Sequence, residues 1–320
     1  MKLTIHDIAK AAGVSTGTVS RALNARSGVN PQTRQRILEL VRELGYVPDI
    51  GARQLAKGKT SVIGITRYAD TSLRNPYYTL LVDAIQAALL GSGYSVQILG
   101  SDAELGDRPF AGVIVAGVRL ADTRLEYLRV SGQTPFVAIS TGASDQEVAS
   151  VELDNRAGML NVIEHLVMRD HRKIAHMTGH PIGRDAQARL EAYREGLKIA
   201  GLEFQCVLDG GFTELGAYRA MQRALRDGVE FTALTCASDE MALGALQALD
   251  DRGQCVPEDM AVTGFDDLPL ETFSSAQLTT VHQPLLEIGR AAAQLLLEQL
   301  GGAAPRSVTF APRLIVRRTA

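Results

Sequence analysis

The chain has 320 residues, of which 46% are hydrophobic and 22% are charged, and its formal net charge is −3. This length accommodates two or three domains of ordinary globular composition. No apolar run approaches the roughly 20 residues that a membrane span needs, so we expect no membrane partner. The start, MKLTIHDIAK, lacks the apolar segment of a secretory signal, which predicts a cytoplasmic location.

The charge is divided unevenly along the chain. Residues 1–60 carry ten Lys or Arg and four Asp or Glu, a balance of +6, whereas the remaining residues carry −9. A basic N-terminal segment on an acidic body is typical of a polyanion-binding module joined to a different domain. A solvated basic surface is the alternative, and charge alone does not separate the two.

Three short helices are predicted in the N-terminal segment. Thr4 is expected to cap a helix that carries Ile5, Ile8, Ala9 and Ala12 on one face and ends at Gly13. Ser15 is a good cap for a second helix, and Asn30 for a third that begins at Pro31. The expected apolar stripe of the third helix is Ile37, Leu38, Val41 and Leu44. The short, glycine-containing connection between the first two helices predicts a helix-turn-helix.

The second helix, in VSTGTVSRALN, has an unusually small outward face. A helix that enters the major groove of DNA must present small or hydrogen-bonding groups, and Thr16, Gly17 and Thr18 lie at its N-terminal end. Arg21 follows on the same face and is able to bond the O6 and N7 atoms of guanine as a fork. The alternative is a plain three-helix core with a polar exterior.

From TIHDIAKAAGVSTGTVSRALN to ARQLAKGKTSVIGI, the sequence resembles the head of the LacI/GalR (lactose-repressor) family of transcription regulators. The resemblance implies a helix-turn-helix head at 1–47 and a hinge helix at 48–60. The hinge enters the minor groove, where Leu55 is the apolar wedge and Arg53, Lys57 and Lys59 are suitably placed cations. The residues expected to bind DNA are Thr4, Ser15, Thr16, Gly17, Thr18, Arg21, Asn24, Asn30, Thr33, Ala52, Arg53, Leu55 and Lys57.

Residues 61–320 alternate short apolar strands with helical patterns. SVIGITR, YSVQILG, AGVIVAG and PFVAIS precede KIAHMTG, TALTCAS and MAVTGFD, and a helix is expected at 76–91. This alternation predicts parallel sheets in two α/β lobes. The resemblance implies a body like a periplasmic sugar-binding protein, with two doubly wound lobes and three crossovers. We expect one lobe at about 61–155 and 284–304 and the other at about 156–280 and 308–320.

The resemblance also places an effector between the lobes, at the carboxyl ends of the strands, where open α/β sheets bind ligands. Asp and Arg are able to bond adjacent hydroxyl groups and an aromatic face packs against sugar C–H groups, so this residue set suits a polyhydroxylated ligand. Each residue alone has a structural alternative as a helix cap or a core residue. The expected effector residues are Asn75, Tyr77, Asp154, Arg189, Phe212, Ser238, Asp266 and Gln283.

One segment departs from the family pattern. Only SDAELGDRPF, residues 101–110, is available between the second and third strands, where the family has a full helix. A parallel crossover usually needs a dozen or more residues, so we expect a loop or a short turn there. We therefore do not expect this chain to make the ligand or partner contacts that the family's longer helix would supply.

Enzyme chemistry is not predicted. The sequence contains no GxGxxG, GxxxxGK[ST], GxSxG or HExxH motif, and His165, His171, His176 and His180 are interpreted as surface or core residues. The three cysteines, Cys206, Cys236 and Cys255, fit no zinc or CxxC spacing, so neither a metal nor another cofactor is expected.

Together, these patterns and the resemblance predict a nucleoid-associated repressor that acts as a homodimer. The resemblance implies a pseudo-palindromic double-stranded DNA operator with a central CG step, and a sugar-like effector that changes the angle between the lobes and melts the hinge helices. No heptad pattern follows the last strand, so no coiled-coil tetramer is expected. The alternatives are a regulator switched by a protein partner, a cytoplasmic small-molecule carrier and, least favoured, a doubly wound enzyme.

Overall fold

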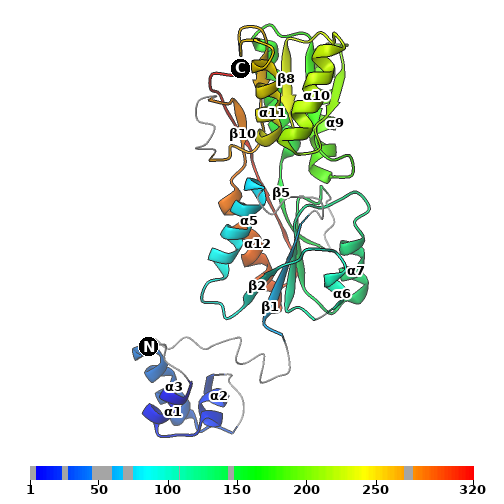
Figure 1. The fold of residues 1–320 in the computed structure, drawn as a ribbon. Helices are drawn as coiled ribbons and strands as arrows, with labels where there is room; N and C mark the ends of the chain where they lie inside the picture. Colours follow the sequence, from blue (N-terminus) through cyan, green and yellow to red (C-terminus); the bar gives the residue numbers. More distant parts are fainter. Residues whose placement is uncertain are drawn as a thin grey trace. The chain divides into compact units, whose positions relative to one another are not determined.

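The computed structural model describes residues 5–23, 28–44, 60–67, 75–107, 109–142, 148–269 and 277–320. They divide into a small N-terminal unit, the head, and a large unit of residues 62–90 and 95–320, the body (Figure 1). Among the helices of these ranges, none is both long and apolar enough to cross a membrane.

The head consists of α1 (Ile5–Ala12), α2 (Thr16–Leu23) and α3 (Pro31–Glu43), as predicted. Gly13, at φ +66°, turns the chain between α1 and α2, a left-handed conformation that glycine adopts without strain. The core of the head is formed by a few small and branched side chains, namely Ile8, Ala9, Ala12, Val19, Ala22 and Ile37.

The predicted apolar stripe of α3 was partly wrong. Ile37 is buried, and Leu40 and Val41 pack against the same core. Leu38 and Leu44 are instead 36% and 42% exposed. The spacing i, i+3, i+4 from Ile37 selects Leu40 and Val41, which leaves Leu38 on the outer face of the helix.

The first lobe of the body is built on a six-stranded parallel sheet with the strand order β11-β5-β4-β3-β1-β2. Gly64 on β1 lies opposite Gln97 on β2 and Val113 on β3. The strands are β1 (Val62–Thr66), β2 (Ser95–Ile98), β3 (Gly112–Val115), β4 (Phe136–Ile139), β5 (Ala149–Leu153) and β11 (Ser307–Phe310).

Helices cover both faces of this sheet. On one face, α12 (Leu285–Leu300) packs against α5 (Pro76–Leu89) and against β3, β4 and β5. The other face carries α6 (Glu104–Asp107) and α7 (Thr123–Ser131) (Figure 1). The lobe is therefore doubly wound, as predicted.

The short connection after β2 is a single helical turn, α6, as the length of the segment predicted. The Glu104 Oε1 atom accepts hydrogen bonds from the backbone N–H groups of Gly100 and Ser101, at 2.8 and 3.1 Å. Leu105 and Phe110, on either side of the end of α6, are buried in the core of this lobe. A Cβ atom on Gly64 of β1 would lie only 3.2 Å from the ring of Phe110, so the glycine lets this ring pack directly on the strand.

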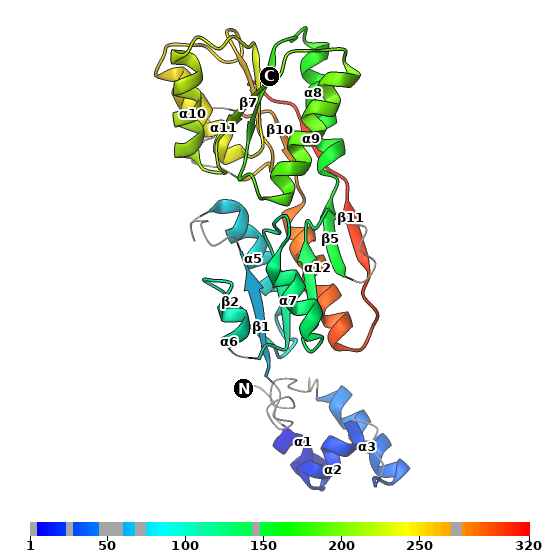
Figure 2. The same cartoon turned by 90° about the vertical axis from the view of Figure 1, so that its right-hand side faces the viewer.

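The second lobe contains a four-stranded parallel sheet in the order β7-β6-β8-β9. Its strands are β6 (Ile174–Thr178), β7 (Cys206–Asp209), β8 (Ala233–Cys236) and β9 (Ala261–Thr263). One face carries α8 (Asn155–Met168) and α9 (Arg184–Ile199), and the other carries α10 (Glu214–Arg226) and α11 (Asp239–Asp250) (Figure 2).

Three segments of the chain pass between the lobes. The first joins β5 to α8, the second joins β10 (Thr280–His282) to α12, and the third joins β11 to β12 (Arg313–Ile315). β10 and β12 pair antiparallel. The expected boundary at residue 308 differs from the structure, because β11 is hydrogen-bonded to β5 in the first lobe.

A buried histidine in the second lobe makes its stability dependent on pH. His176 is fully buried, its Nδ1 atom lies 2.7 Å from the Thr235 hydroxyl, and its ring stacks on Tyr193 at 5.0 Å. Burial, and secondarily the charge of Arg189, lowers the pKa of His176 from 6.5 to about 3. Below pH 6.5 the unfolded chain therefore binds a proton that the folded chain excludes, so stability falls as the pH falls.

We expect the wild type to lose about 2 kcal/mol more folding free energy than His176→Asn between pH 7 and pH 5. Asn retains a hydrogen-bonding atom near the position of Nδ1 but does not titrate in this range. The measurement is urea unfolding of both proteins, followed by circular dichroism at the two pH values. Equal losses in the two proteins would show that other groups cause the acid sensitivity.

Candidate functional site

A pocket in the body is lined by residues from both lobes. Most of them follow the carboxyl end of a parallel strand, as open α/β sheets favour. The cavity measures about 70 Å³, which is smaller than the few hundred Å³ of typical ligand pockets. The lining residues are Asn75, Tyr77, Tyr78, Asp185, Phe212, Ser238, Glu240, Asp266 and Leu268.

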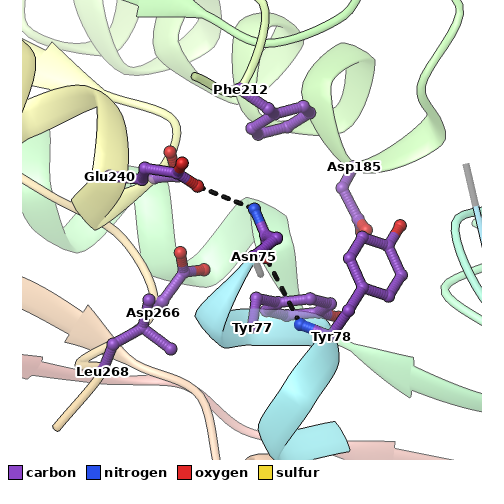
Figure 3. A pocket seen from close by; sticks show the side chains of 9 residues that line it. Asn75, Tyr77, Tyr78, Asp185, Phe212, Glu240, Asp266 and Leu268 are labelled. Carbon is purple, nitrogen blue, oxygen red and sulfur yellow. Dashed lines mark hydrogen bonds between the residues drawn. The ribbon is translucent and has the colours of Figure 1, made fainter. Parts of the chain in front are cut away.

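A hydrogen bond joins the two lobes across this pocket. Asn75 caps α5 of the first lobe, where its Oδ1 atom accepts from the backbone N–H of Tyr78 at 3.3 Å. Its Nδ2 atom donates to Oε2 of Glu240, in the first turn of α11 of the second lobe, at 2.7 Å (Figure 3). An amide carries both a donor and an acceptor, so one side chain serves the helix and the opposite lobe together.

Aromatic rings face the pocket from both lobes. Tyr77 and Tyr78 lie in the first turn of α5, with ring centroids 5.3 Å apart and planes at 83°. Phe212 of the second lobe lies on the opposite side of the same space (Figure 3). Its backbone has φ +57°, and its ring sits so close to Gly179 that a Cβ atom there would overlap it.

Arg189 lies behind the pocket wall rather than in it. The side chain is 3% exposed, its Nε atom donates to Asn155 Oδ1 at 2.8 Å, and its NH1 group donates to the Ala237 carbonyl at 2.6 Å. The guanidinium lies 3.7 Å from the ring centroid of Phe265 and 3.8 Å from a carboxylate oxygen of Asp266. These contacts hold the Nε and NH1 groups and place the charge of Arg189 against Asp266.

Asp266 is held from behind by the same network. The Gln283 Nε2 atom donates to Asp266 Oδ1 at 2.5 Å, and the backbone N–H of Asp239 approaches Oδ2 at 3.4 Å. Burial raises the pKa of Asp266 well above its usual range, although the charge of Arg189 opposes this rise. Burial also raises the pKa of the neighbouring Asp239 to about 6.

The structure brings five of the eight expected effector residues together at the pocket: Asn75, Tyr77, Phe212, Ser238 and Asp266. Arg189 and Gln283 contact Asp266 from behind. Asp154 is an exposed cap of α8 whose Oδ1 atom accepts from the Ala157 N–H at 2.8 Å, and it does not line the pocket.

Four lining residues were not expected from the sequence: Tyr78, Asp185, Glu240 and Leu268. Asp185 and Glu240 lie in the first turns of α9 and α11, which follow β6 and β8. The rule that places ligands at the carboxyl ends of strands could have identified these two. Tyr78 and Leu268 have no comparable signal.

The head presents a polar helix surface. Ser15 caps α2, and its Oγ atom accepts from the Thr18 N–H at 3.2 Å and lies 2.9 Å from the Thr18 hydroxyl. Gly17 and Arg21 are exposed, and the Arg21 Nε atom donates to the Gly17 carbonyl at 3.2 Å. Val19 and Ala22 face the core, so the side of α2 that carries Arg21 is open to a partner.

Of the other residues expected to bind DNA, some lie in the described head and the rest do not. Asn30 caps α3 by accepting from the Gln32 N–H at 2.9 Å. Thr33, in the first turn of that helix, and Thr16 of α2 are both partly buried. The remaining positions lie outside the residues that the structure describes: Thr4, Asn24, Ala52, Arg53, Leu55 and Lys57.

Comparisons with known proteins agree with this architecture. The family model "Bacterial regulatory proteins, lacI family" matches residues 4–49, and "Periplasmic binding protein-like domain" matches residues 163–320. The chain is 36% identical to the HTH-type transcriptional regulator MalR of Streptomyces coelicolor, over 99% of this chain and 96% of that protein. It is 30% identical to catabolite control protein A of Priestia megaterium, over 94% and 93% of the two chains.

Solved structures extend the similarity to the whole chain. A complex of the transcriptional regulator CelR with cellobiose has a TM-score of 0.75 and 29% identity, and covers all of both chains. A lac repressor dimer bound to operator and an anti-inducer has a TM-score of 0.76 and 26% identity, and covers 100% of this chain and 99% of that one. The head, the two-lobed body and the parallel sheets predicted from sequence are thereby confirmed.

The contact between Gly179 and Phe212 yields a test of the pocket. In Gly179→Ala the added methyl group displaces the Phe212 ring, so we expect ligand affinity to fall about 10- to 100-fold, the value of one well-packed aromatic contact. Calorimetric titration with a ligand identified by thermal shift measures this loss. Gly106→Ala in α6, where an added Cβ atom would meet only the Tyr127 hydroxyl, at 3.9 Å, is the matched control. Unchanged affinity in Gly179→Ala would remove Phe212 from the binding surface.

Proposed function

Because the chain belongs to the LacI family of bacterial regulatory proteins, we propose that it is a repressor controlled by a sugar-like effector bound between the lobes of its body. Like its relatives, the chain is a DNA-binding transcriptional regulator and not an enzyme. The effector, the operator symmetry and the assembly are the proposed part.

The pocket with walls from both lobes is the observation that carries the proposal. Its cavity of about 70 Å³ is small for a ligand pocket, and the bond from Asn75 to Glu240 crosses it. A ligand that enters must break or replace this bond and change the separation of the lobes. Such a ligand has different affinities for the two lobe arrangements, which is the requirement for a ligand-controlled switch.

The chemistry of the pocket supports a polyhydroxylated ligand. Carboxylate and amide groups on its walls accept and donate hydrogen bonds, and Tyr77, Tyr78 and Phe212 supply flat apolar faces. A solved relative is a complex with cellobiose, which supports the same ligand class. The residues proposed to bind the effector are Asn75, Tyr77, Phe212, Ser238 and Asp266, and Arg189 and Gln283 are proposed to position Asp266.

The DNA-bound form is proposed to be a homodimer in the cytoplasm, on the nucleoid. Two heads related by a two-fold axis would place two α2 helices on a pseudo-palindromic operator, with residues 48–60 as hinges at a central CG step. The open polar face of α2 supports this arrangement, and one solved relative is a dimer on its operator. We propose that the first lobe comprises about 61–155 and 284–304 and the second about 156–280 and 308–320. The exception is β11, which belongs to the first lobe.

The experiment is operator selection followed by an effector screen. The full chain is used to select duplexes from a random pool, and fluorescence anisotropy measures operator affinity with and without neutral sugars, sugar acids, nucleosides and purines. A sugar that changes operator affinity supports the proposal. If a nucleoside or purine changes operator affinity instead, the sugar effector is contradicted. It is also contradicted if no small molecule changes operator affinity and a protein partner does.

Arg21→Ala tests the role of α2. If Arg21 reads a guanine, its loss should cost about 1–3 kcal/mol on the selected operator and relax the preference at one base pair. Anisotropy with the operator, single-base variants and random DNA measures both effects. Arg226→Ala, an exposed residue at the end of α10 in the body, is the control. Equal weakening on random DNA would indicate that Arg21 contacts only phosphate.

A further inference from the structure

The pocket is lined by acidic side chains. Asp185, Glu240 and Asp266 contribute carboxyl groups to its lining, and among the described lining residues there is no Lys, Arg or His. The guanidinium of Arg189 is 3% exposed and directed toward Asn155, Ala237, Phe265 and Asp266. Its charge lies against Asp266, so Asp185 and Glu240 are the carboxyl groups of the described lining that have no ion pair.

The two carboxylates on opposite sides of the cavity retain acceptor capacity. Asp185 Oδ1 accepts from the Asn155 Nδ2 atom at 2.8 Å, and Glu240 Oε2 accepts from Asn75. Within the described residues the second oxygen of each carboxylate has no hydrogen-bond donor. Both side chains are held by neutral amides, and among the described residues neither is paired with a cation.

The aromatic rings define the shape of the space between these carboxylates. Phe212 lies on one side and Tyr77 and Tyr78 on the other, while Glu240 and Asp185 are at the two ends (Figure 3). A ring that enters this space presents its C–H faces to the aromatic side chains and its edge hydroxyl groups to the carboxylates. This arrangement suits a ring-shaped ligand with hydrogen-bond donors at opposite edges.

We propose that Asp185 and Glu240 make the effector site selective for charge, so that it takes neutral sugars or amino sugars and rejects sugar phosphates and sugar acids. The inference rests on the proposed function and narrows its ligand class. An anionic group in the cavity would lie close to the carboxylates of Asp185 and Glu240, and the repulsion between like charges would weaken its binding. A hydroxyl or ammonium group instead donates to the free carboxylate oxygens.

The test is calorimetric titration of the full chain with matched probes. The uncharged or cationic probes are glucose, maltose, cellobiose and glucosamine, and the anionic probes are glucose 6-phosphate and gluconate. We expect at least one of the first group to bind and each anionic probe to bind at least about 100-fold more weakly. An anionic probe that binds as tightly as the best neutral or cationic probe overturns the inference and leaves the regulator function intact.

Two charge-removing variants identify the residues responsible. Glu240→Gln and Asp185→Asn preserve the shape of each side chain, so we expect each to reduce the 100-fold discrimination at least about tenfold. Glu230→Gln removes an exposed carboxylate, 82% accessible, from the same lobe and serves as the control. Unchanged discrimination in both pocket variants, with native circular dichroism, overturns the assignment.

Failure of the inference and failure of the proposed function are separable on the same samples. If none of the probes binds, the charge selection is overturned together with the sugar effector. Operator binding, measured by anisotropy, then shows whether the DNA-binding function stands without them. A wild type that binds both operator and an anionic sugar contradicts only the charge selection.

Discussion

The buried charge of Arg189 is the constraint on which the pocket of the body depends. A guanidinium that is 3% exposed must be compensated inside the protein, because an unpaired buried charge is strongly destabilising. Arg189 meets this requirement with Asn155 from α8, the Ala237 carbonyl after β8, the Phe265 ring and Asp266 after β9. The same contacts gather the ends of these elements at one edge of the sheet, so electrostatic compensation and assembly of the binding wall have one cause.

The wall is connected to the crossover between the lobes. Asp266, at φ +138°, receives a hydrogen bond from Gln283 and exchanges backbone bonds with β10, which leads into α12 of the first lobe. Together with Phe212 at φ +57°, it places a strained backbone at the pocket, where surrounding contacts must maintain it. Asp266 therefore joins the pocket wall to the segment that links the lobes, through which the proposed effector would act on the first lobe.

The head and the body meet different physical demands. The head has a small core around Ile8, Val19 and Ile37. The side of α2 that faces away from this core is polar and carries Arg21. The body has large cores in each lobe and carries an excess of negative charge, whereas the first 60 residues carry a balance of +6. A cationic head concentrates attraction to DNA on one module, because phosphate contacts supply most of the non-specific affinity.

The sequence by itself determined the local structure of this protein and its family. Gly13, the caps at Ser15 and Asn30, and the apolar runs of the strands are local signals, so they predicted the head, the two lobes and the one-turn connection at residues 101–110. Tertiary structure alone decided that Tyr78 and Leu268 line the pocket and that β11 joins the first sheet. It also turned Arg189 and Gln283 away from the cavity toward Asp266. These outcomes depend on how segments far apart in the chain approach one another, and no periodicity or spacing within a segment encodes that approach.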